Sequence, residues 1–408
     1  MKEDLTQGPV IKTMLRFAVP MIFGNLLQQC YNIADTLIVG RFLGAGALAA
    51  VGSAFSLMTF LTSILLGLAM GSGTVFSIRF GQKDQLGLKE GILASFVLLS
   101  IVTALLNTAV FMGLDWIIWI LRTPANLVAT MREYLSVIFI GLAGIFLFNF
   151  FTSLLRSLGN SVVPLLFLAV SAVLNIALDL WFVAGLNRGA AGAAEATVIS
   201  QYVSGIGIAV YTRIKYPELL RRDKKVRFRL SRVKEITGFS ALTCLQQSIM
   251  NLGILMVQGL VNSFGTTIMA AFAAAVKIDA FAYLPVQDFG NAFSIFTAQN
   301  YGAKQTERIK KGIRAALTAS VAFSLMVSFC VFVFAKPLMT LFINAEETAV
   351  IEEGVRYLHI EGAFYFLIGI LFLFYGLYRA LAKPGMSVVL TIASVSYTHL
   401  TLPTTSRV

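Results

Sequence analysis

Residues 162–185 read VVPLLFLAVSAVLNIALDLWFVAG, and Asp179 is the one ionisable side chain in this stretch. A helix needs about 20 apolar residues to cross a bilayer, so this stretch is long enough to span one. Similar runs recur along the chain, and together they predict an all-α polytopic membrane protein. The expected spans lie near residues 14–39, 47–77, 91–113, 133–155, 162–185, 190–211, 236–259, 266–297, 315–335 and 357–378, with an incomplete span from about residue 386.

The composition of the chain excludes most classes of soluble protein. Hydrophobic residues make up 57% of the sequence and charged residues 13%, whereas a soluble domain has about 25% charged residues. The mean hydropathy is +0.81. Such a chain has too little polar surface to cover a globule in water. Intrinsic disorder, a disulfide scaffold and a DNA-binding fold are also disfavoured.

The net charge of +12 does not indicate a nucleic-acid partner, because the basic residues gather in one segment. Ten Lys and Arg residues lie between residues 213 and 234, with apolar spans on both sides. Lys and Arg concentrate in the cytoplasmic loops of membrane proteins. With the N-terminus inside, inner segments hold 24 Lys and Arg and outer segments six. This bias predicts a multi-pass protein with a cytoplasmic N-terminus. We expect its location to be the bacterial cytoplasmic membrane.

The sequence repeats itself at a nearly constant offset. Two six-helix lobes related by duplication would explain the repeat, and an even number of spans per lobe makes them run parallel. We therefore predict an N-terminal lobe at 1–212, a basic cytoplasmic linker at 213–234 and a C-terminal lobe at 235–394. The matching pairs are Leu27-Gln-Gln29 with Leu245-Gln-Gln247, Gly81 with Gly302, Lys89-Glu-Gly-Ile92 with Lys310-Lys-Gly-Ile313, and Leu155-Arg-Ser-Leu158 with Tyr378-Arg-Ala-Leu381.

The repeat predicts twelve helices, of which this chain has room for 10–11. After Arg156 the first half continues through two further spans to residue 212, whereas the chain ends at Val408, soon after Arg379. The segment 395–408 changes character abruptly and resembles translated adapter sequence at the ends of assembled bacterial reading frames. We expect a non-native tail there, with a genuine short variant as the alternative.

Polar side chains inside the spans of the first half are the leading candidates for function. A charged side chain at the bilayer centre costs at least about 2.5–3.5 kcal/mol, so such residues are rarely incidental. Asn175 and Asp179 are four positions apart and share a helix face. With Asp35 and Thr197 they offer two carboxylates, an amide carbonyl and a hydroxyl, which suit a hard cation or a shared proton. The alternative is that these acids only hydrogen-bond between helices, and for Glu195 that it faces a loop.

Several other residues are weaker candidates. Lys277 and Asp288 lie on one face of the 266–297 span but about 16 Å apart along its axis, so they cannot pair. With Asp279 they either line a second cavity or satisfy loop backbone at the end of this long span. Pro20 removes one backbone hydrogen bond of the first span and makes it a candidate hinge, or only a static kink. Gly71-Ser-Gly73 indicates close helix packing.

Residues 10–393 carry a set of motifs that resembles the multidrug and toxic compound extrusion (MATE) transporters. The motifs are spread over both halves of the chain, so the resemblance covers almost all of it. They are Pro20…Asn25-Leu-Leu-Gln28…Tyr31-Asn-Ile-Ala-Asp35-Thr…Gly40, Gly81-Gln82 with Gly91, Arg156…Gly159-Asn160…Pro164, Asn175-x-x-x-Asp179, Gly192-Ala193-Ala194…Ala196-Thr197, Gln299-Asn300-Tyr301-Gly302-Ala303 and Tyr378-Arg379.

The resemblance implies an antiporter that expels cationic hydrophobic drugs as Na⁺ or H⁺ flows in. It also implies a cation site in the N-terminal lobe made by Asp35, Asn175, Asp179 and Thr197. One branch of the family has acids in its seventh and tenth helices, but residues 236–278 and 362–378 contain neither Asp nor Glu. We therefore expect the N-terminal lobe to carry the coupling. Glu195 stands where the family pattern usually has an apolar residue.

Two other functions remain as alternatives to drug antiport. A lipid-linked saccharide flippase of the same superfamily would want a cationic cavity, for which Lys277 is the one candidate charge within a span. A membrane-embedded transferase would need a sizeable polar catalytic loop, and the outer loops are short. No phosphate-binding Gly-rich loop with Lys-Ser/Thr is present, so ATP-driven transport is not expected. We expect a monomeric transporter in the lipid bilayer, with no cofactor other than the coupling ion.

Overall fold

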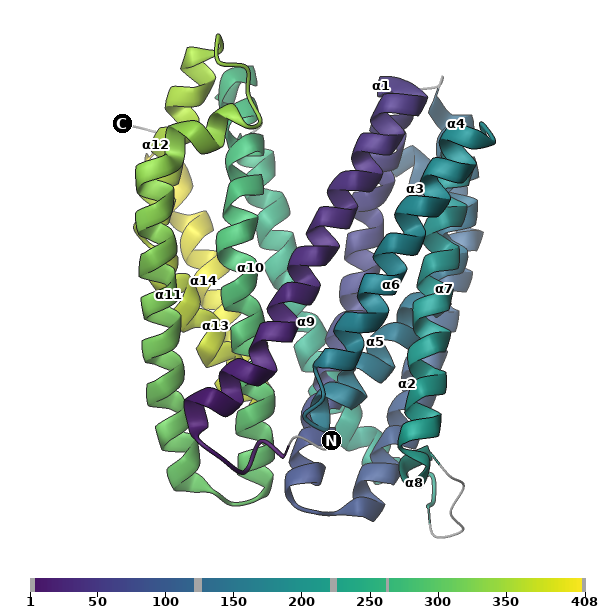
Figure 1. Ribbon diagram of the computed structural model, residues 1–408, viewed down its shortest axis with the longest axis vertical. Helices are drawn as coiled ribbons and strands as arrows, with labels where there is room; N and C mark the ends of the chain where they lie inside the picture. Colours follow the sequence, from purple (N-terminus) through teal and green to yellow (C-terminus); the bar gives the residue numbers. More distant parts are fainter. Residues whose placement is uncertain (1–3, 121–126, 221–225, 262–263, 406–408) are drawn as a thin grey trace. The chain divides into compact units, whose positions relative to one another are not determined.

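The computed structural model describes residues 4–120, 127–220, 226–261 and 264–405, and gives residues 396–405 as backbone only. Within these ranges the regular structure is entirely helical. The predicted tail at 395–408 therefore lies largely outside the described side chains. The helices are α1 (Val10–Gly81), α2 (Gln85–Met112), α3 (Leu114–Ile120), α4 (Val128–Ile138), α5 (Leu142–Ser157), α6 (Val162–Asp179), α7 (Gly189–Lys215), α8 (Pro217–Leu220), α9 (Leu230–Val261), α10 (Thr266–Gly302), α11 (Thr306–Thr340), α12 (Thr348–Gly362), α13 (Tyr365–Ala380) and α14 (Pro384–Thr405) (Figure 1).

The helices confirm the prediction of an all-α polytopic membrane protein. Eight described helices are long and apolar enough to cross a bilayer, and α12 with α13 makes a ninth such span bent by 50°. The predicted span at 236–259 lies within α9, and the incomplete one begins close to the start of α14. Large apolar side chains such as Leu105, Val173 and Phe329 are exposed in the middle of their helices, where a bilayer would cover them.

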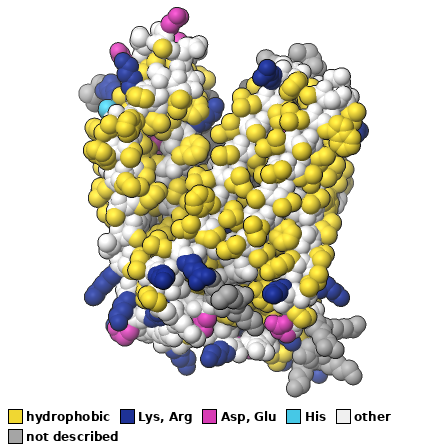
Figure 2. Space-filling model, viewed as in Figure 1, with side chains coloured by type: hydrophobic (Ala, Val, Ile, Leu, Met, Phe, Trp, Pro, Cys, Tyr) yellow, Lys and Arg dark blue, Asp and Glu magenta, His cyan; other side chains and the backbone are white. Residues whose placement is uncertain are grey.

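Figure 2 shows the same distribution on the visible face of the molecule. Within each unit apolar side chains cover most of the visible surface, and most of the visible Lys and Arg side chains lie toward its ends. Charged residues at helix ends and apolar residues between them are what a bilayer requires of a spanning bundle.

Two spans are merged in α1, and the break between them lies at Gly44. This residue has φ 82° and ψ 178°, a conformation that glycine adopts because it has no Cβ. The two parts, Val10–Gly44 and Gly46–Gly81, are each long enough to span a bilayer. Pro20 lies inside the first part, with helix on both sides. Its role as a hinge stays a prediction.

The chain divides into two compact units that do not follow the order of the sequence. Unit 1 contains Leu27–Cys244, and unit 2 contains Leu5–Leu26 together with Leu245–Val408. The predicted lobe boundaries place all of the first span in the N-terminal lobe, whereas α1 and α9 are each shared between the units. Both division points coincide with the two copies of Leu-Gln-Gln, at Leu27 and Leu245.

Glycines allow the closest helix contacts in unit 1. A Cβ added at Gly71 would lie 2.5 Å from the Cα of Ser240 in α9, and one at Gly73 would lie 2.2 Å from the Ser153 side chain in α5. The prediction that Gly71-Ser-Gly73 serves close packing is confirmed. Around these contacts, α7 packs against α4, α5 and α6.

Unit 2 is built around α10, which packs against α11, α12 and α13 (Figure 1). The N-terminal part of α1 joins this unit through Phe17 and Met21, which are buried in one cluster with Phe293. The segment before the helix is held by Arg308, whose guanidinium donates to the carbonyl oxygens of three residues. These are Leu5 at 3.2 Å, Gln7 at 2.7 Å and Gly8 at 2.6 Å.

An ion-pair network in unit 1 joins the start of α9 to the start of α2. The Glu90 side chain is only 1% exposed and lies 3.3 Å from the Arg232 Nε and 3.1 Å from the Arg229 Nε. Arg232 also contacts Glu235 at 3.1 Å, and Glu235 contacts Arg79 at 2.7 Å. The basic segment thus ends in a fixed structure, because a buried carboxylate requires a nearby positive charge.

We expect Arg232→Ala to destabilise the protein more than Arg229→Ala. Arg232 is 23% exposed and contacts two carboxylates, whereas Arg229 is 54% exposed and contacts one. Leaving Glu90 with a weaker partner should cost roughly 2–3 kcal/mol, but losing an exposed pair should cost below about 1 kcal/mol. Thermal unfolding of the detergent-solubilised variants measures the difference. Equal losses for the two variants would contradict this ranking.

Candidate cation and substrate sites

The four residues predicted to bind a cation come from three helices of unit 1. Asn175 and Asp179 occupy the last turn of α6, while Asp35 lies on α1 and Thr197 on α7. Directly after Asp179 the backbone continues as a π-helix over Leu180–Gly185. Such wider turns are rare and frequently occur at functional sites.

The structure brings these four residues together in two pairs. The Asn175 Nδ2 donates to the Thr197 Oγ1 at 3.3 Å, and the carboxyl groups of Asp35 and Asp179 are within hydrogen-bonding contact. Asp179 is fully buried and Asn175 is 2% exposed. Since two carboxylates have no proton to donate to each other, the contact requires a shared proton or a bound cation.

Unsatisfied oxygens at this site also point to a missing positive charge. The Oδ1 of Asn175 and both carboxylate oxygens of Asp179 are buried without a hydrogen-bond donor. Buried polar atoms are normally hydrogen-bonded, so an exception calls for an explanation. A cation or a proton placed among these oxygens would supply one. No group of three or more His, Cys, Asp or Glu side chains suited to a metal ion occurs among the described residues.

Two tyrosines accompany the carboxyl pair, and the sequence reasoning did not select them. The phenols of Tyr31 and Tyr134 are both close enough to Asp35 and Asp179 to interact with their charges. Tyr31 is one helical turn before Asp35, so helical spacing was a usable signal. Tyr134 comes from α4, and nothing in the local sequence connects it with α1 or α6.

Glu195 forms an ion pair with Arg188. Its carboxylate lies 2.7 Å from the Arg188 Nη1, and its side chain is 24% exposed. The Arg188 guanidinium in turn lies 5.7 Å from the ring centroid of Phe182. The contact with Arg188 corresponds to the interpretation that Glu195 faces a loop.

The three candidates on α10 have three different environments. The Lys277 Nζ lies 5.7 Å from the ring centroid of Phe342. Both carboxylate oxygens of Asp288 accept from the Asn25 Nδ2, at 2.7 and 2.6 Å. Asp279 lines a cavity.

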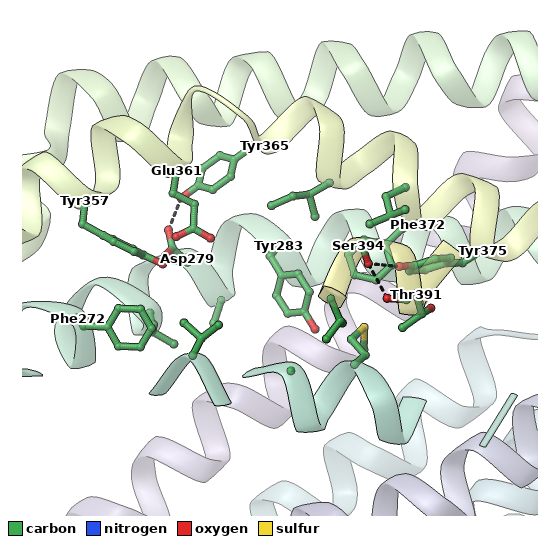
Figure 3. Close-up of a pocket in the computed structure, with 18 residues that line it drawn as sticks. Phe272, Asp279, Tyr283, Tyr357, Glu361, Tyr365, Phe372, Tyr375, Thr391 and Ser394 are labelled. Atoms are coloured by element: carbon green, nitrogen blue, oxygen red, sulfur yellow. Dashed lines mark hydrogen bonds between the residues drawn. The ribbon is translucent and has the colours of Figure 1, made fainter. Parts of the chain in front are cut away.

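The cavity lies within unit 2 and has a volume of about 430 Å³. Asp279 and Glu361 are its acidic lining residues, and their carboxyl groups are within hydrogen-bonding contact. The Tyr365 phenol donates to the Asp279 Oδ1 (Figure 3). The sequence reasoning missed Glu361, which lies near the end of α12, directly before the range found to be free of acids. The remaining aromatic lining residues are Phe272, Tyr283, Tyr357, Phe372 and Tyr375.

Comparison with known proteins gives a match over both halves of the chain. The MatE family model matches residues 20–181 and 241–404. The starts of the two matched segments have the same separation as Gly81 and Gly302, one of the pairs that define the internal repeat. Each half of the chain therefore matches the same family model in the register of the repeat, as a duplication requires.

Two relatives and one solved structure illustrate the similarity. "Probable multidrug resistance protein YpnP" of Bacillus subtilis (strain 168) is 31% identical over 409 residues, covering 99% of this chain and 89% of the relative. "Probable multidrug resistance protein YoeA" of the same organism is 31% identical over 350 residues, covering 83% and 75%. A solved outward-facing structure of a multidrug resistance MATE family transporter of the MOP superfamily has a TM-score of 0.89 at 23% identity, covering 96% and 87%, which shows a shared fold.

Proposed function

This chain belongs to the MatE family, and from that premise we propose that it is a secondary active multidrug efflux antiporter. It expels cationic hydrophobic compounds in exchange for Na⁺ or H⁺. The observation that carries the antiport proposal is the contact of Asp35 with the buried Asp179, beside unsatisfied oxygens of Asn175 and Asp179. An acceptor-rich buried site is stable only when a positive charge occupies it.

The proposed cycle is alternating access with competition between drug and cation. An outward-facing conformer releases the drug and admits the cation to Asp35, Asn175, Asp179 and Thr197. Neutralising the carboxyl pair favours the inward-facing conformer, which loses the cation and loads drug. A ligand shifts such an equilibrium only through its different affinities for the two conformers. The coupling ion must therefore bind while the protein faces outward and the carboxyl pair is charged. It must leave while the protein faces inward.

The chemistry of the cavity supports a cationic rather than an anionic substrate. Its described lining includes two acids and no Lys or Arg. A flippase for an anionic lipid-linked saccharide would need the opposite charge, because a buried anion requires a cationic partner. Lys277, the one basic candidate within a span, lies against Phe342 instead.

The location follows from the same premises. We place the protein in the bacterial cytoplasmic membrane with its N-terminus in the cytoplasm, as the bias of Lys and Arg toward the inner segments indicates. With the opposite orientation, the basic segment at 213–234 would have to cross the membrane.

Ethidium transport by purified protein in liposomes tests the proposal and identifies the ion. When a Na⁺ or H⁺ gradient is imposed, we expect ethidium to move in the direction opposite to the flow of that ion. The movement should stop when an ionophore collapses the gradient. The driving ion is the one whose gradient alone sustains transport. Correctly inserted protein that moves no ethidium under either gradient would contradict multidrug antiport.

A further inference from the structure

We propose that the cavity between α10, α12 and α13 is a binding site for a hydrophobic organic monocation, with Asp279 and Glu361 as its anionic pair. The role of this cavity in efflux rests on the proposed function. Binding itself is measured without transport, so the two proposals can fail separately.

The charge of the pair is suited to a single positive charge. Asp279 is only 8% exposed, and its Oδ2 has no hydrogen-bond donor among the described residues. Its Oδ1 accepts from the Tyr365 phenol, and its other contact is the carboxyl group of Glu361. Two carboxyl groups in contact share one proton, so the pair carries one net negative charge. A monocation neutralises that charge without displacing the shared proton.

The remaining lining selects an organic cation over a bare ion. Figure 3 shows aromatic rings along the cavity on both sides of the carboxyl groups, and six of the lining residues are Phe or Tyr. Phe272 and Tyr357 pack edge to face at 5.3 Å between centroids on the same side as the acids. Aromatic faces attract ammonium-type cations. The volume of about 430 Å³ also lies within the range of about 300–1,000 Å³ for small-molecule sites.

The pair is not a copy of the carboxyl pair in unit 1. In the register that pairs Gly81 with Gly302, the first-half counterpart of Asp279 is Met58. In the register that pairs Arg156 with Arg379, the counterpart of Glu361 is Ile138. Met58 and Ile138 are both buried in the apolar core of unit 1.

The duplication therefore supplied no acid at this place, and the second half has acquired a charged cavity of its own. This asymmetry fits a division of labour between the two units. The coupling ion would bind at the carboxyl pair of unit 1, and the organic cation would bind in the cavity of unit 2.

Equilibrium binding of tetraphenylphosphonium to the purified chain in detergent tests the site. This probe has a permanent charge, so its protonation does not change with pH. We expect the double variant Asp279→Asn/Glu361→Gln to weaken binding by about tenfold or more, because it removes the net negative charge that the cation pairs with. Either single substitution leaves one carboxylate, and therefore the same net charge, in the cavity. Glu353→Gln changes an exposed acid on the same helix as Glu361 and should bind as the wild type does. Uncharged triphenylphosphine oxide should not compete.

Three results would overturn the assignment. The first is wild-type affinity in a monodisperse Asp279→Asn/Glu361→Gln double variant. The second is competition by the uncharged probe, which would indicate an apolar occupant such as a lipid chain. The third is loss of binding when Asp35→Asn is the only substitution that weakens it. That result would place the organic cation in unit 1, but it would not contradict the proposal of drug antiport.

A measurement on protein that keeps both Asp279 and Glu361 covers the case in which the double variant misfolds. In Asp35→Asn protein, tetraphenylphosphonium binding should weaken as the pH falls, because a second proton on the pair of Asp279 and Glu361 removes its net charge. Binding that does not change with pH would also overturn the assignment.

Discussion

Asp35→Asn is expected to abolish ion-coupled efflux while the protein still folds and inserts. The substitution keeps the size of the side chain but removes one of the two carboxyl groups that the coupling ion is proposed to bridge. Asp179 would then face an amide, which can donate to it permanently. Because the new amide then donates to the Asp179 oxygens in every state, the site has nearly the same energy with and without the coupling ion. The ion gradient therefore cannot drive drug movement.

Uptake of ethidium into inverted membrane vesicles, under the ion gradient that drives the wild type, measures this loss of transport. We expect less than about a tenth of the wild-type rate, because a site with lost differential affinity cannot shift the conformational equilibrium. Glu195→Gln is the matched control, since Glu195 is a second acid of the same unit but pairs with Arg188 instead. It should retain efflux. Wild-type efflux from Asp35→Asn protein would overturn the role of this carboxyl pair.

The fold could be predicted from the sequence because the bilayer imposes a simple rule on it. Each predicted span falls on helical segments, since a spanning segment must be apolar and must satisfy its own backbone. The sharing of α1 and α9 between the units could not be predicted, because it depends on packing between segments far apart in the chain. Phe17 illustrates this: its burial against Phe293 is invisible in local hydropathy.

The candidate sites also contain residues that could be predicted from the sequence and residues that could not. Asn175 and Asp179 could be selected because helical spacing puts them on one face, and their contacts with Thr197 and Asp35 agree with the resemblance to the family. Glu361 could not be connected with Asp279 from spacing, because the two lie on different helices. The 50° bend between α12 and α13 comes directly after Glu361, and its angle depends on packing that the sequence of the segment does not reveal.

The second large effect is expected at Gly71, where Gly71→Val should prevent unit 1 from packing. A Cβ at this position would lie 2.5 Å from the Cα of Ser240 and 2.8 Å from the carbonyl oxygen of Phe239. These are backbone atoms, so no side-chain rotation can relieve the overlap. The contact is also fixed by hydrogen bonds, because the Ser240 hydroxyl donates to the carbonyl of Leu68 at 2.9 Å. Separating α1 from α9 would break it.

Gly71→Val should lower the free energy of unfolding by more than about 3 kcal/mol. That value is the upper end of the usual cost of overpacking that side-chain movements can relieve. Gly52→Val is the matched control, since a Cβ at Gly52 of the same helix meets no atom within 4 Å, and surface changes of this kind usually stay within about 0.5 kcal/mol. Size-exclusion profiles and thermal unfolding in detergent compare the two variants, and we expect aggregated or poorly inserted protein only for Gly71→Val. If that variant eluted as a single sharp peak and unfolded at the wild-type temperature, α1 and α9 could not be in backbone contact. The attachment of the first part of α9 to unit 1 would then depend on other contacts, such as the ion pairs of Glu90 and Glu235, and the close helix packing inferred at Gly71 would be wrong.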